Sequence, residues 1–315
     1  MINLDKRIYS NDFLKELKFH LNSLEKYITY PKFVFLCGRA YKNDQGVEDY
    51  KSSNRGLIEN LLSVKSKNIF FVLSEELWEE SFNSRIDLLT FEDFLADVSD
   101  SIILFVESPG TFAELGAFAY ANNLFGEKLI VIIDKKYEFD KSFIITGPVA
   151  KVKKQKATIV FTPNFRGDLM ACAELRKIID NRVKEFESKN AKVNKCKPNI
   201  HSDTVVLKVF IVEILELIYI LQPINRIDLI NIYKNIKGFE KFEFVKKNND
   251  SFYNEIRVEY ILKLLTNVKL IKMQNDIIQS DNYEIYEEFL FGYGKALRNK
   301  VRNKLLSRKY KYKEI

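Results

Sequence analysis

Hydrophobic and polar positions over residues 31–161 predict strands and helices in alternation. Unbroken apolar runs of five or six residues are typical of strands buried on both faces of a sheet. They lie at 33–37, 69–73, 101–106, 128–133 and 157–161. Helical patterns separate several of them, near 53–64, 91–98 and 111–124, and a further helical pattern covers 167–189. We therefore expect an α/β domain at 31–189, built on a doubly wound parallel sheet of the flavodoxin- or Rossmann-like kind.

The chain outside this region has helical periodicity instead. Four leucines at steps of three and four residues predict an amphipathic helix over 11–29, which we expect to act as a brace at 1–30 that packs onto the segment following it. They are Leu14, Leu17, Leu21 and Leu24. After the α/β domain, a polar stretch rich in Asn and Lys predicts a linker at 190–202.

Residues 203–315 predict a second, mainly α domain. Helical patterns cover 203–222, where Pro223 ends the first one, then 226–236 and 254–267. The segment 270–280 has apolar residues on both sides of Asn275-Asp276, which predicts a two-stranded hairpin. Three helices and a hairpin are the outline of a winged helix, so we expect a winged-helix-like fold.

The composition limits the chemistry that this chain can perform. An apolar content of 46% with 13% aromatic residues excludes a disordered chain. There are only two histidines, His20 and His201, and the three cysteines form no C-x-x-C pair. We therefore expect no metal site, a reducing compartment, and chemistry that depends on carboxylates.

The apolar segments do not predict a membrane span. The N-terminus lacks a long apolar region, and the longest apolar run, at 205–221, contains Lys208, Glu213 and Glu216. Such a run fits a buried amphipathic helix better than a membrane helix. We expect a cytoplasmic protein with no membrane partner.

The positive charge lies in the C-terminal part. Residues 1–189 hold 27 basic and 28 acidic side chains, a balance of −1, whereas residues 190–315 hold 23 and 15, a balance of +8. Nine basic residues lie within 295–313, among two tyrosines, an arrangement that attracts nucleic-acid phosphates. A solvated helix face is the alternative. The residues expected to bind nucleic acid are Arg298, Lys300, Arg302, Lys304, Arg308 and Lys309.

The most specific segment for chemistry is ESPGTFAELGAF at 107–118, which follows a predicted strand and begins a helix. Ligands of open α/β sheets bind beyond the carboxyl ends of strands. We expect Pro109 and Gly110 to form a turn that approaches a phosphate closely, and Thr111 to cap the helix. Glu114 is expected in the first helical turn, kept ionised by the helix dipole and able to attack a sugar C1′. Alternatively, Glu114 only satisfies the helix N-terminus.

Other candidate residues follow or flank the predicted strands. Cys37, Gly38 and Arg39 come after the first strand, where backbone N–H groups and a guanidinium can meet a phosphate. Cys37 could instead be a small buried residue, and Arg39 a solvated charge. Glu92 is either catalytic or a residue that favours its own helix N-terminus. Trp78 is expected to pack rather than to stack on a base.

The segments FVFLCG at 33–38, FEDFLADVSDSIILF at 91–105 and the 107–118 turn resemble the nucleoside deoxyribosyltransferase family. That family carries an acidic residue, an Asp eight positions later that begins a strand, and a Gly-Thr-x-x-Glu-x-Gly turn whose Glu is the nucleophile. The matching residues here are Glu92, Asp100, Gly110, Thr111, Glu114 and Gly116. The resemblance covers about residues 31–135 and implies catalysis by Glu114, with Glu92 as a second catalytic residue.

Two departures from that family matter. Glu92 stands where the family has Asp, and Ser108 replaces the Asp of the turn that contacts the base. The family's base preference therefore does not carry over to this chain, although Ser108 is still expected to contact substrate.

A second resemblance covers most of the chain. The 102–118 segment, KKYEFDKSFIITGPV at 135–149 and a basic C-terminal domain together resemble the deoxyribosyltransferase-like effectors of bacterial retrons. The resemblance implies a toxic antiviral effector that is restrained by a reverse transcriptase and its branched RNA–DNA hybrid. Assembly into an oligomer or filament is left open. It also implies cleavage of an N-glycosidic bond in NAD+ or a purine nucleoside or nucleotide. NAD+ would be a substrate, and no cofactor is expected.

Two other classes of function fit parts of the same pattern. A metabolic nucleoside deoxyribosyltransferase explains the 107–118 segment but does not need the C-terminal domain. A transcription regulator with a nucleotide-sensing domain explains both domains without catalysis.

Overall fold

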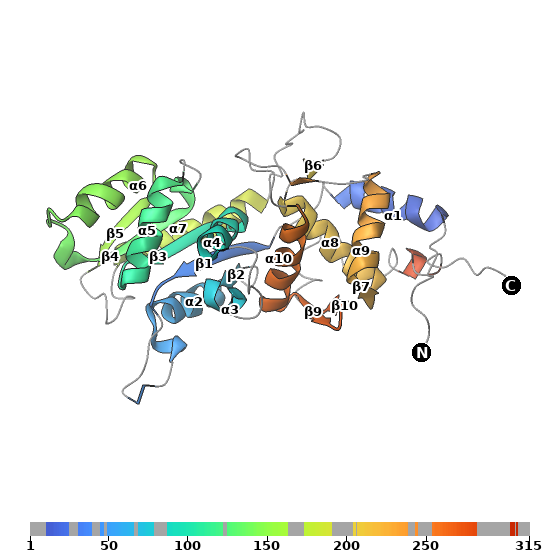
Figure 1. Cartoon of the computed structure of the whole chain (residues 1–315), viewed down its shortest axis with the longest axis horizontal. Helices are drawn as coiled ribbons and strands as arrows, with labels where there is room; N and C mark the ends of the chain where they lie inside the picture. Colours follow the sequence, from blue (N-terminus) through green and yellow to red (C-terminus); the bar gives the residue numbers. More distant parts are fainter. Residues whose placement is uncertain are drawn as a thin grey trace. The chain divides into compact units, whose positions relative to one another are not determined.

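The computed structural model divides the chain into two compact units (Figure 1). Unit 2 holds residues 31–189, and unit 1 joins residues 1–30 to residues 190–315. The structure describes residues 11–24, 31–39, 45–46, 49–65, 69–78, 87–121, 125–162, 173–190, 204–205, 207–238, 243–244, 254–281, 303–305 and 307. The predicted linker at 190–202 lies outside these residues except for Asn190.

Unit 2 is built on a five-stranded sheet in the order β2-β1-β3-β4-β5, and every neighbouring pair is parallel. The strands are β1 (Lys32–Cys37), β2 (Ile69–Val72), β3 (Ser101–Phe105), β4 (Leu129–Asp134) and β5 (Thr158–Thr162). All six residues of β1 and all five of β3 are buried, as their unbroken apolar runs predict. The predicted α/β class with a parallel sheet is confirmed.

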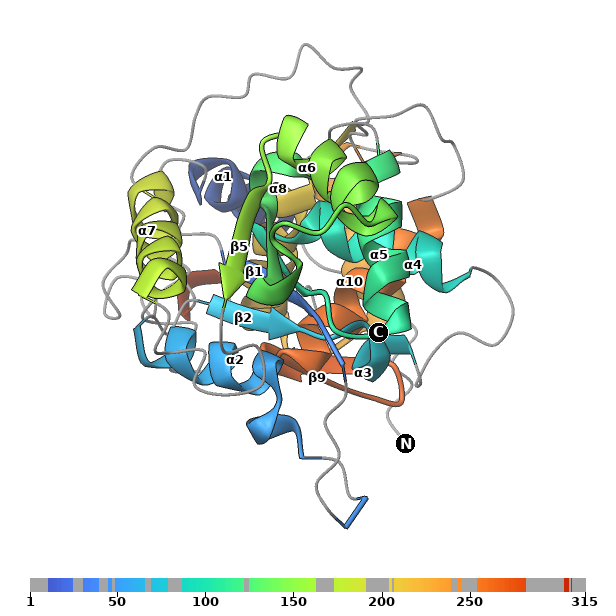
Figure 2. The same ribbon diagram turned by 90° about the vertical axis from the view of Figure 1, so that its left-hand side faces the viewer.

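Helices cover both faces of this sheet. Figure 2 shows α2 and α7 on one side and α4 and α5 on the other. Alternate strand residues such as Val34, Leu36 and Ile103 form a core with Ile58 of α2 and Leu175 of α7. The opposite set of strand residues, which includes Cys37, therefore faces α4 and α5. The helices of unit 2 are α2 (Asn54–Lys65), α3 (Ser74–Trp78), α4 (Leu88–Val98), α5 (Pro109–Tyr120), α6 (Ala150–Lys154) and α7 (Ala173–Asn190).

Unit 1 is mainly helical. Its helices are α1 (Asn11–Leu24), α8 (Leu207–Leu221), α9 (Arg226–Lys237) and α10 (Asn254–Asn267). Its short strands are β6 (Thr204–Val205), β7 (Ile224–Asn225), β8 (Glu243–Phe244), β9 (Ile271–Gln274) and β10 (Ile277–Ser280). The three C-terminal helices lie where their periodicity predicts them, within a few residues.

The N-terminal helix packs differently from our expectation. We expected it to pack onto the segment that follows it, but α1 contacts α9 and groups with unit 1. Its apolar face, which includes Phe13, Leu17 and Leu21, is buried, and His20 Nε2 lies 2.6 Å from Glu216 Oε1 of α8. The apolar face of α1 and the His20–Glu216 pair place this helix in unit 1. The spacing of the leucines predicts the helix but does not specify which part of the chain it packs against.

The predicted hairpin is confirmed. β9 and β10 pair antiparallel, with Gln274 opposite Ile277, and the intervening Asn275 and Asp276 both have positive φ angles. Asn and Asp tolerate this backbone conformation in two-residue turns. β7 pairs with β10, so the hairpin becomes a three-stranded sheet.

Helix α8 is the centre of the unit 1 core. Every side chain from Phe210 to Leu221 is buried, including those of Glu213 and Glu216. Glu213 accepts hydrogen bonds from Tyr233 Oη at 2.9 Å and Lys237 Nζ at 2.5 Å, so its charge is compensated inside the core. Within the described part of the chain, no helix is both long and apolar enough to cross a bilayer.

Candidate active site

The strand order brings two segments of the sequence together at one edge of the sheet. The order reverses between β1 and β3, which are neighbours although β2 lies between them in sequence. Open α/β sheets bind ligands at such a point, beyond the carboxyl ends of the strands. Cys37, at the end of β1, pairs with Leu104 near the end of β3. Residues 37–39 and 107–118 are therefore brought to the same edge, as the sequence predicts.

The turn before α5 is a reciprocal capping box. Ser108 is the N-cap and its hydroxyl accepts from the Thr111 N–H, while Thr111 Oγ1 accepts from the Ser108 N–H at 2.9 Å. Our expectation that Thr111 is the cap is wrong, because Thr111 is the third helical residue. Pro109 and Gly110 are the first helical residues, and Gly110 does not have a positive φ angle.

Glu114 lies in the second turn of α5 and not in the first. It is half-buried, and its Oε2 has no hydrogen-bond partner among the described residues. Burial, together with the nearby Glu92 and Glu75 carboxylates, raises the pKa of Glu114 to about 7, against the opposing effects of Arg55 and a hydrogen bond from Cys37. The helix dipole therefore does not keep this carboxyl fully ionised at neutral pH, contrary to our expectation.

Glu92 is placed beside Glu114 by α4. It is buried, and burial raises its pKa, partly offset by a hydrogen bond from Ser74. Glu92 does not serve its own helix N-terminus, because Asp87 is the N-cap of α4 and accepts from the Thr90 N–H at 2.8 Å. Glu92 therefore has no part in capping its own helix.

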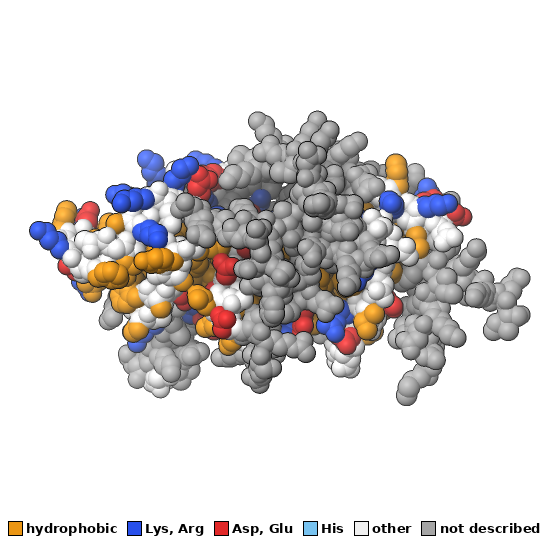
Figure 3. All heavy atoms as spheres, turned by 45° about the horizontal axis from the view of Figure 1, so that its top comes forward, with side chains coloured by type: hydrophobic (Ala, Val, Ile, Leu, Met, Phe, Trp, Pro, Cys, Tyr) orange, Lys and Arg blue, Asp and Glu red, His pale blue; other side chains and the backbone are white. Residues whose placement is uncertain are grey.

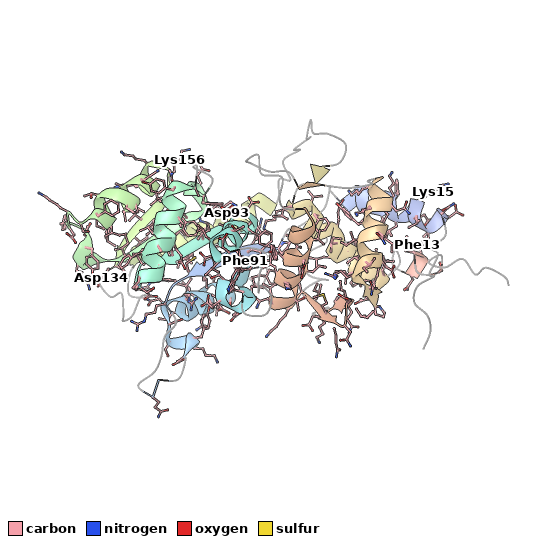
Figure 4. All side chains as sticks on the ribbon, viewed as in Figure 1. Phe13, Lys15, Phe91, Asp93, Asp134 and Lys156 are labelled. Atoms are coloured by element: carbon pink, nitrogen blue, oxygen red, sulfur yellow. The ribbon has the colours of Figure 1, made fainter. Side chains whose placement is uncertain are left out.

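Trp78 packs, as expected. Its ring lies 5.8 Å from that of Phe91, measured between centroids, at a tilt of 46°. Phe91 is buried on α4, where Figure 4 labels it together with Asp93. The contact joins α3 to α4 next to Glu92, so it fixes the helix that carries this carboxylate.

Cys37 and Gly38 line the carboxyl end of β1. The Cys37 thiol is buried and donates a hydrogen bond to Glu114, and burial together with the Glu114 charge raises the thiol pKa well above its usual value. The thiol is therefore protonated and is not a nucleophile. At Gly38, a Cβ atom would lie 2.9 Å from Arg55 Cγ and 3.1 Å from Glu107 Oε1, so only glycine leaves room for both side chains.

Glu107 is a member of the site that sequence reasoning missed. Its Oε1 accepts from the Arg39 backbone N–H at 2.8 Å, and its Oε2 accepts from Asn54 Nδ2 at 2.8 Å. It therefore ties the end of β1 and the start of α2 to the end of β3. Its position directly after a predicted strand was the available signal. Arg39 itself is exposed and enters this cluster through its backbone.

Arg55 was missed as well. It lies in the first turn of α2, it is 3% exposed, and its guanidinium forms an ion pair with Glu75 of α3. In a parallel sheet, the helix that follows β1 begins near the carboxyl ends of the strands. A charged residue in the first turn of α2, such as Arg55, therefore lies near the candidate active site.

Asp100 links the start of β3 to β1 and does not lie at the candidate active site. Its Oδ2 accepts from the Phe33 backbone N–H at 2.9 Å, and its own N–H donates to the Phe33 carbonyl at 2.8 Å. It therefore joins β3 to β1 at the opposite end of the strands from Glu114.

The surface over α5 and α6 is both aromatic and basic. Figure 3 shows hydrophobic side chains in orange next to blue Lys and Arg side chains on this part of unit 2. The exposed aromatic residues are Phe112, Tyr120, Phe139 and Phe143. Lys151 Nζ lies 3.7 Å from the centroid of the Tyr120 ring, a cation–π contact that orders one of these lysines.

Of the residues predicted to bind nucleic acid, the structure describes Lys304. It is exposed, and its Nζ lies 3.7 Å from Glu16 Oε2 of α1. Arg298, Lys300, Arg302, Arg308 and Lys309 lie outside the described residues.

The fold and site together define a class of protein. A five-stranded parallel sheet carries a cluster of acidic side chains at the point where its strand order reverses, and the chain also holds a second, mainly helical unit. Residues 51–273 match the model of a family described as STM3845 retron effector protein. This match covers more than half of the chain, and the chain belongs to that family.

Two relatives come from retrons of Escherichia coli. The retron Ec73 putative ribosyltransferase/DNA-binding protein is 28% identical over 280 residues, which are 83% of this chain and 80% of the relative. The retron Ec86 putative ribosyltransferase/DNA-binding protein is 39% identical over 123 residues, which are 38% of this chain and 37% of the relative. The match to the Ec86 protein thus spans little more than a third of either chain.

Proposed function

We propose that this retron effector is a toxic enzyme of antiviral defence that cleaves an N-glycosidic bond, with Glu114 as the nucleophile. NAD+ and purine nucleosides or nucleotides are the candidate substrates. The observation that carries the proposal is the Glu114 carboxyl at the switch point of the sheet, with Oε2 unpartnered among the described residues and Glu92 beside it. The ribosyltransferase names of the two relatives agree with this chemistry.

In the proposed reaction, Glu114 Oε2 forms a bond to the sugar C1′ while the bond from C1′ to the base nitrogen breaks. The electron pair of the broken bond stays on that nitrogen, so the pyridinium ring of NAD+ leaves as neutral nicotinamide. Water then attacks C1′ and releases Glu114. The hydrogen bond from Cys37 lowers the pKa of Glu114 and so favours the ionised carboxylate, and Oε2 has no hydrogen-bond partner among the described residues.

Glu92 is the proposed acid and base of this reaction. A purine leaves as an anion unless it gains a proton, and burial raises the pKa of Glu92, which favours the protonated carboxyl that this role needs. In the second step the same group, now ionised, takes a proton from the attacking water. Two carboxyls with these complementary roles are the usual pair in glycoside hydrolysis.

We assign nucleic-acid and partner binding to unit 1. Helix α8, strand β7, helices α9 and α10 and the β9–β10 hairpin follow one another in the order of a winged helix. In this proposal the reverse transcriptase and its branched RNA–DNA hybrid bind there, restrain the enzyme and release it on infection. The DNA-binding names of the relatives support this assignment.

The test is to incubate the purified protein with NAD+ and, separately, with purine nucleosides, and to measure free base. Glu114→Gln should lose activity by a factor of at least about 10³, because the amide keeps the shape but cannot form the glycosyl ester. Glu127→Gln is the matched control, since the Glu127 side chain is 75% exposed and lies away from the sheet edge, and it should retain activity.

The results separate the three classes of function. Free base formed with water alone supports the glycosidase, whereas base release only with an acceptor nucleobase indicates a deoxyribosyltransferase. Full activity or toxicity of a folded Glu114→Gln protein rules out Glu114 as nucleophile. Binding of these compounds without any base release favours the nucleotide-sensing regulator.

A further inference from the structure

Arg55 is a buried cation within a group of carboxylates. Among the described residues, the buried lysine and arginine side chains are Lys32 and Arg55, and Lys32 lies at the opposite end of β1 near Asp100. The Arg55 side chain is 3% exposed, whereas its ion-pair partner Glu75 is 44% exposed. Removing a guanidinium from water is unfavourable unless other groups interact with its charge. We therefore expect Arg55 to interact with buried groups as well as with the partly exposed Glu75.

The interior neighbours of Arg55 belong to the candidate active site. Its Cγ and Cδ pack against Gly38, the residue that follows Cys37. Glu107 Oε1 also lies close to Gly38. Its Nε is buried and has no hydrogen-bond partner among the described residues. Its positive charge lowers the pKa values of Cys37, Glu107 and Glu114.

We propose that Arg55 is a positioning residue for Glu114, held in place by Glu75 and by the space at Gly38, so that its buried charge favours the ionised nucleophile. Glu92 and Glu75 raise the pKa of Glu114, and Glu107 is a further acidic side chain at this edge. Without a compensating cation, Glu114 would hold its proton and could not attack C1′. This inference rests on the proposed role of Glu114, but its first test does not require catalysis.

The first test follows the titration of Glu114 directly. In full-length protein labelled with ¹³C-carboxyl glutamate, the Glu114 signal is identified by its loss in Glu114→Gln and followed from pH 4 to 10. Arg55→Met keeps most of the side-chain volume and removes the charge, and should raise the Glu114 titration midpoint by about one pH unit or more. Arg55→Lys keeps the charge and should leave the midpoint near that of wild type. Arg176→Met removes an exposed arginine of α7 and should leave it unchanged.

A midpoint that does not move in folded Arg55→Met overturns the proposal, as does the same upward shift in Arg55→Lys and Arg55→Met. If Arg55→Met fails to fold, Gly38→Ala replaces it, because the new Cβ would displace Arg55 from 2.9 Å. It should raise the midpoint too, and an unchanged midpoint again overturns the proposal.

The second test measures base release against pH. The acid limb of kcat/KM should move to higher pH in Arg55→Met by the same amount as the Glu114 titration. A purely structural arginine would lower activity at all pH values without moving this limb. If the titration moves but no variant, wild type included, releases base, the proposed enzymatic function fails while the role of Arg55 in the charge of Glu114 stands.

Discussion

At the scale of single residues, burial opposes the proposed role of Glu114 and favours the proposed role of Glu92. Glu114 must be ionised to attack, whereas Glu92 must hold a proton to donate it. Burial raises the pKa of both carboxyls, to about 7 for Glu114. The Arg55 charge and the Cys37 hydrogen bond oppose this effect at Glu114, and the Ser74 hydrogen bond opposes it at Glu92.

This predicts how activity depends on pH. With NAD+, whose leaving group needs no proton from Glu92, kcat/KM should follow the ionisation of Glu114. Below pH 7 most of Glu114 is protonated and unable to attack, so kcat/KM should rise about tenfold per pH unit on the acid side and level off above about pH 7. An initial-rate series between pH 5 and 9 measures this limb. A limb near pH 4.5, the usual value of a glutamate, would show that Glu114 is not held in the buried environment of the structure.

At the scale of secondary structure, the capping box decides how α5 begins. Ser108→Ala removes the side chain that accepts from the Thr111 N–H, and should lower the free energy of unfolding by about 1 kcal/mol. Gly110→Ala is the matched control two residues on: its Cβ would lie 3.9 Å from Ser108 Oγ, and alanine favours a helix, so stability should not fall. Urea denaturation of both variants makes the comparison.

The variants Ser108→Ala and Gly110→Ala also test the predicted contact between this turn and the substrate. Loss of base release in stable Gly110→Ala would indicate that substrate approaches the backbone at this turn. Equal destabilisation by the two substitutions would contradict the capping box.

The elements that the sequence predicts best depend on local pattern. The strands of unit 2 and the hairpin at Asn275-Asp276 follow from apolar runs and turn residues, because neighbours in sequence determine them. The site was predicted where its residues follow strands, as at Cys37 and in 107–118. Arg55 and Glu75 were not, because they meet the site only through the order of the strands and the packing of α2 and α3, which no local pattern encodes.

At the scale of the whole molecule, the first and last parts of the sequence form one unit. The His20–Glu216 pair joins α1 to the buried α8, with side-chain exposures of 10% and 4%. His20→Ala would leave the Glu216 carboxyl buried without this partner, and should cost unit 1 about 1–3 kcal/mol. Phe19→Ala, on the same helix but 79% exposed, should cost little.

Hydrogen exchange resolved by segment measures this effect in the full chain. His20→Ala should speed exchange in α8 and α9 and leave β3 and β4 of unit 2 unchanged. Equal exchange in the two variants would mean that the pair does not stabilise unit 1. Faster exchange in β3 and β4 as well would mean that the two units unfold together.

The charge division between the two parts of the chain predicts how nucleic acid is held. Residues 190–315 carry +8 and residues 1–189 carry −1, so we expect phosphate binding in the C-terminal part. Replacing Arg298, Arg302 and Arg308 by Ser should remove up to three phosphate contacts. Each lost contact should flatten the dependence of log K on log salt by roughly 0.7 to 0.9 units.

Co-purification with the RNA–DNA hybrid across a salt series measures that slope, and base release from a small substrate serves as the control for folding. Activity should survive, because Glu114 and Glu92 belong to unit 2. If retention and slope match those of wild type, these arginines do not hold the hybrid. Binding would then be expected at the aromatic and basic surface over α5 and α6, where Lys151 stacks on Tyr120 and exposed Phe139 and Phe143 offer rings to unpaired bases.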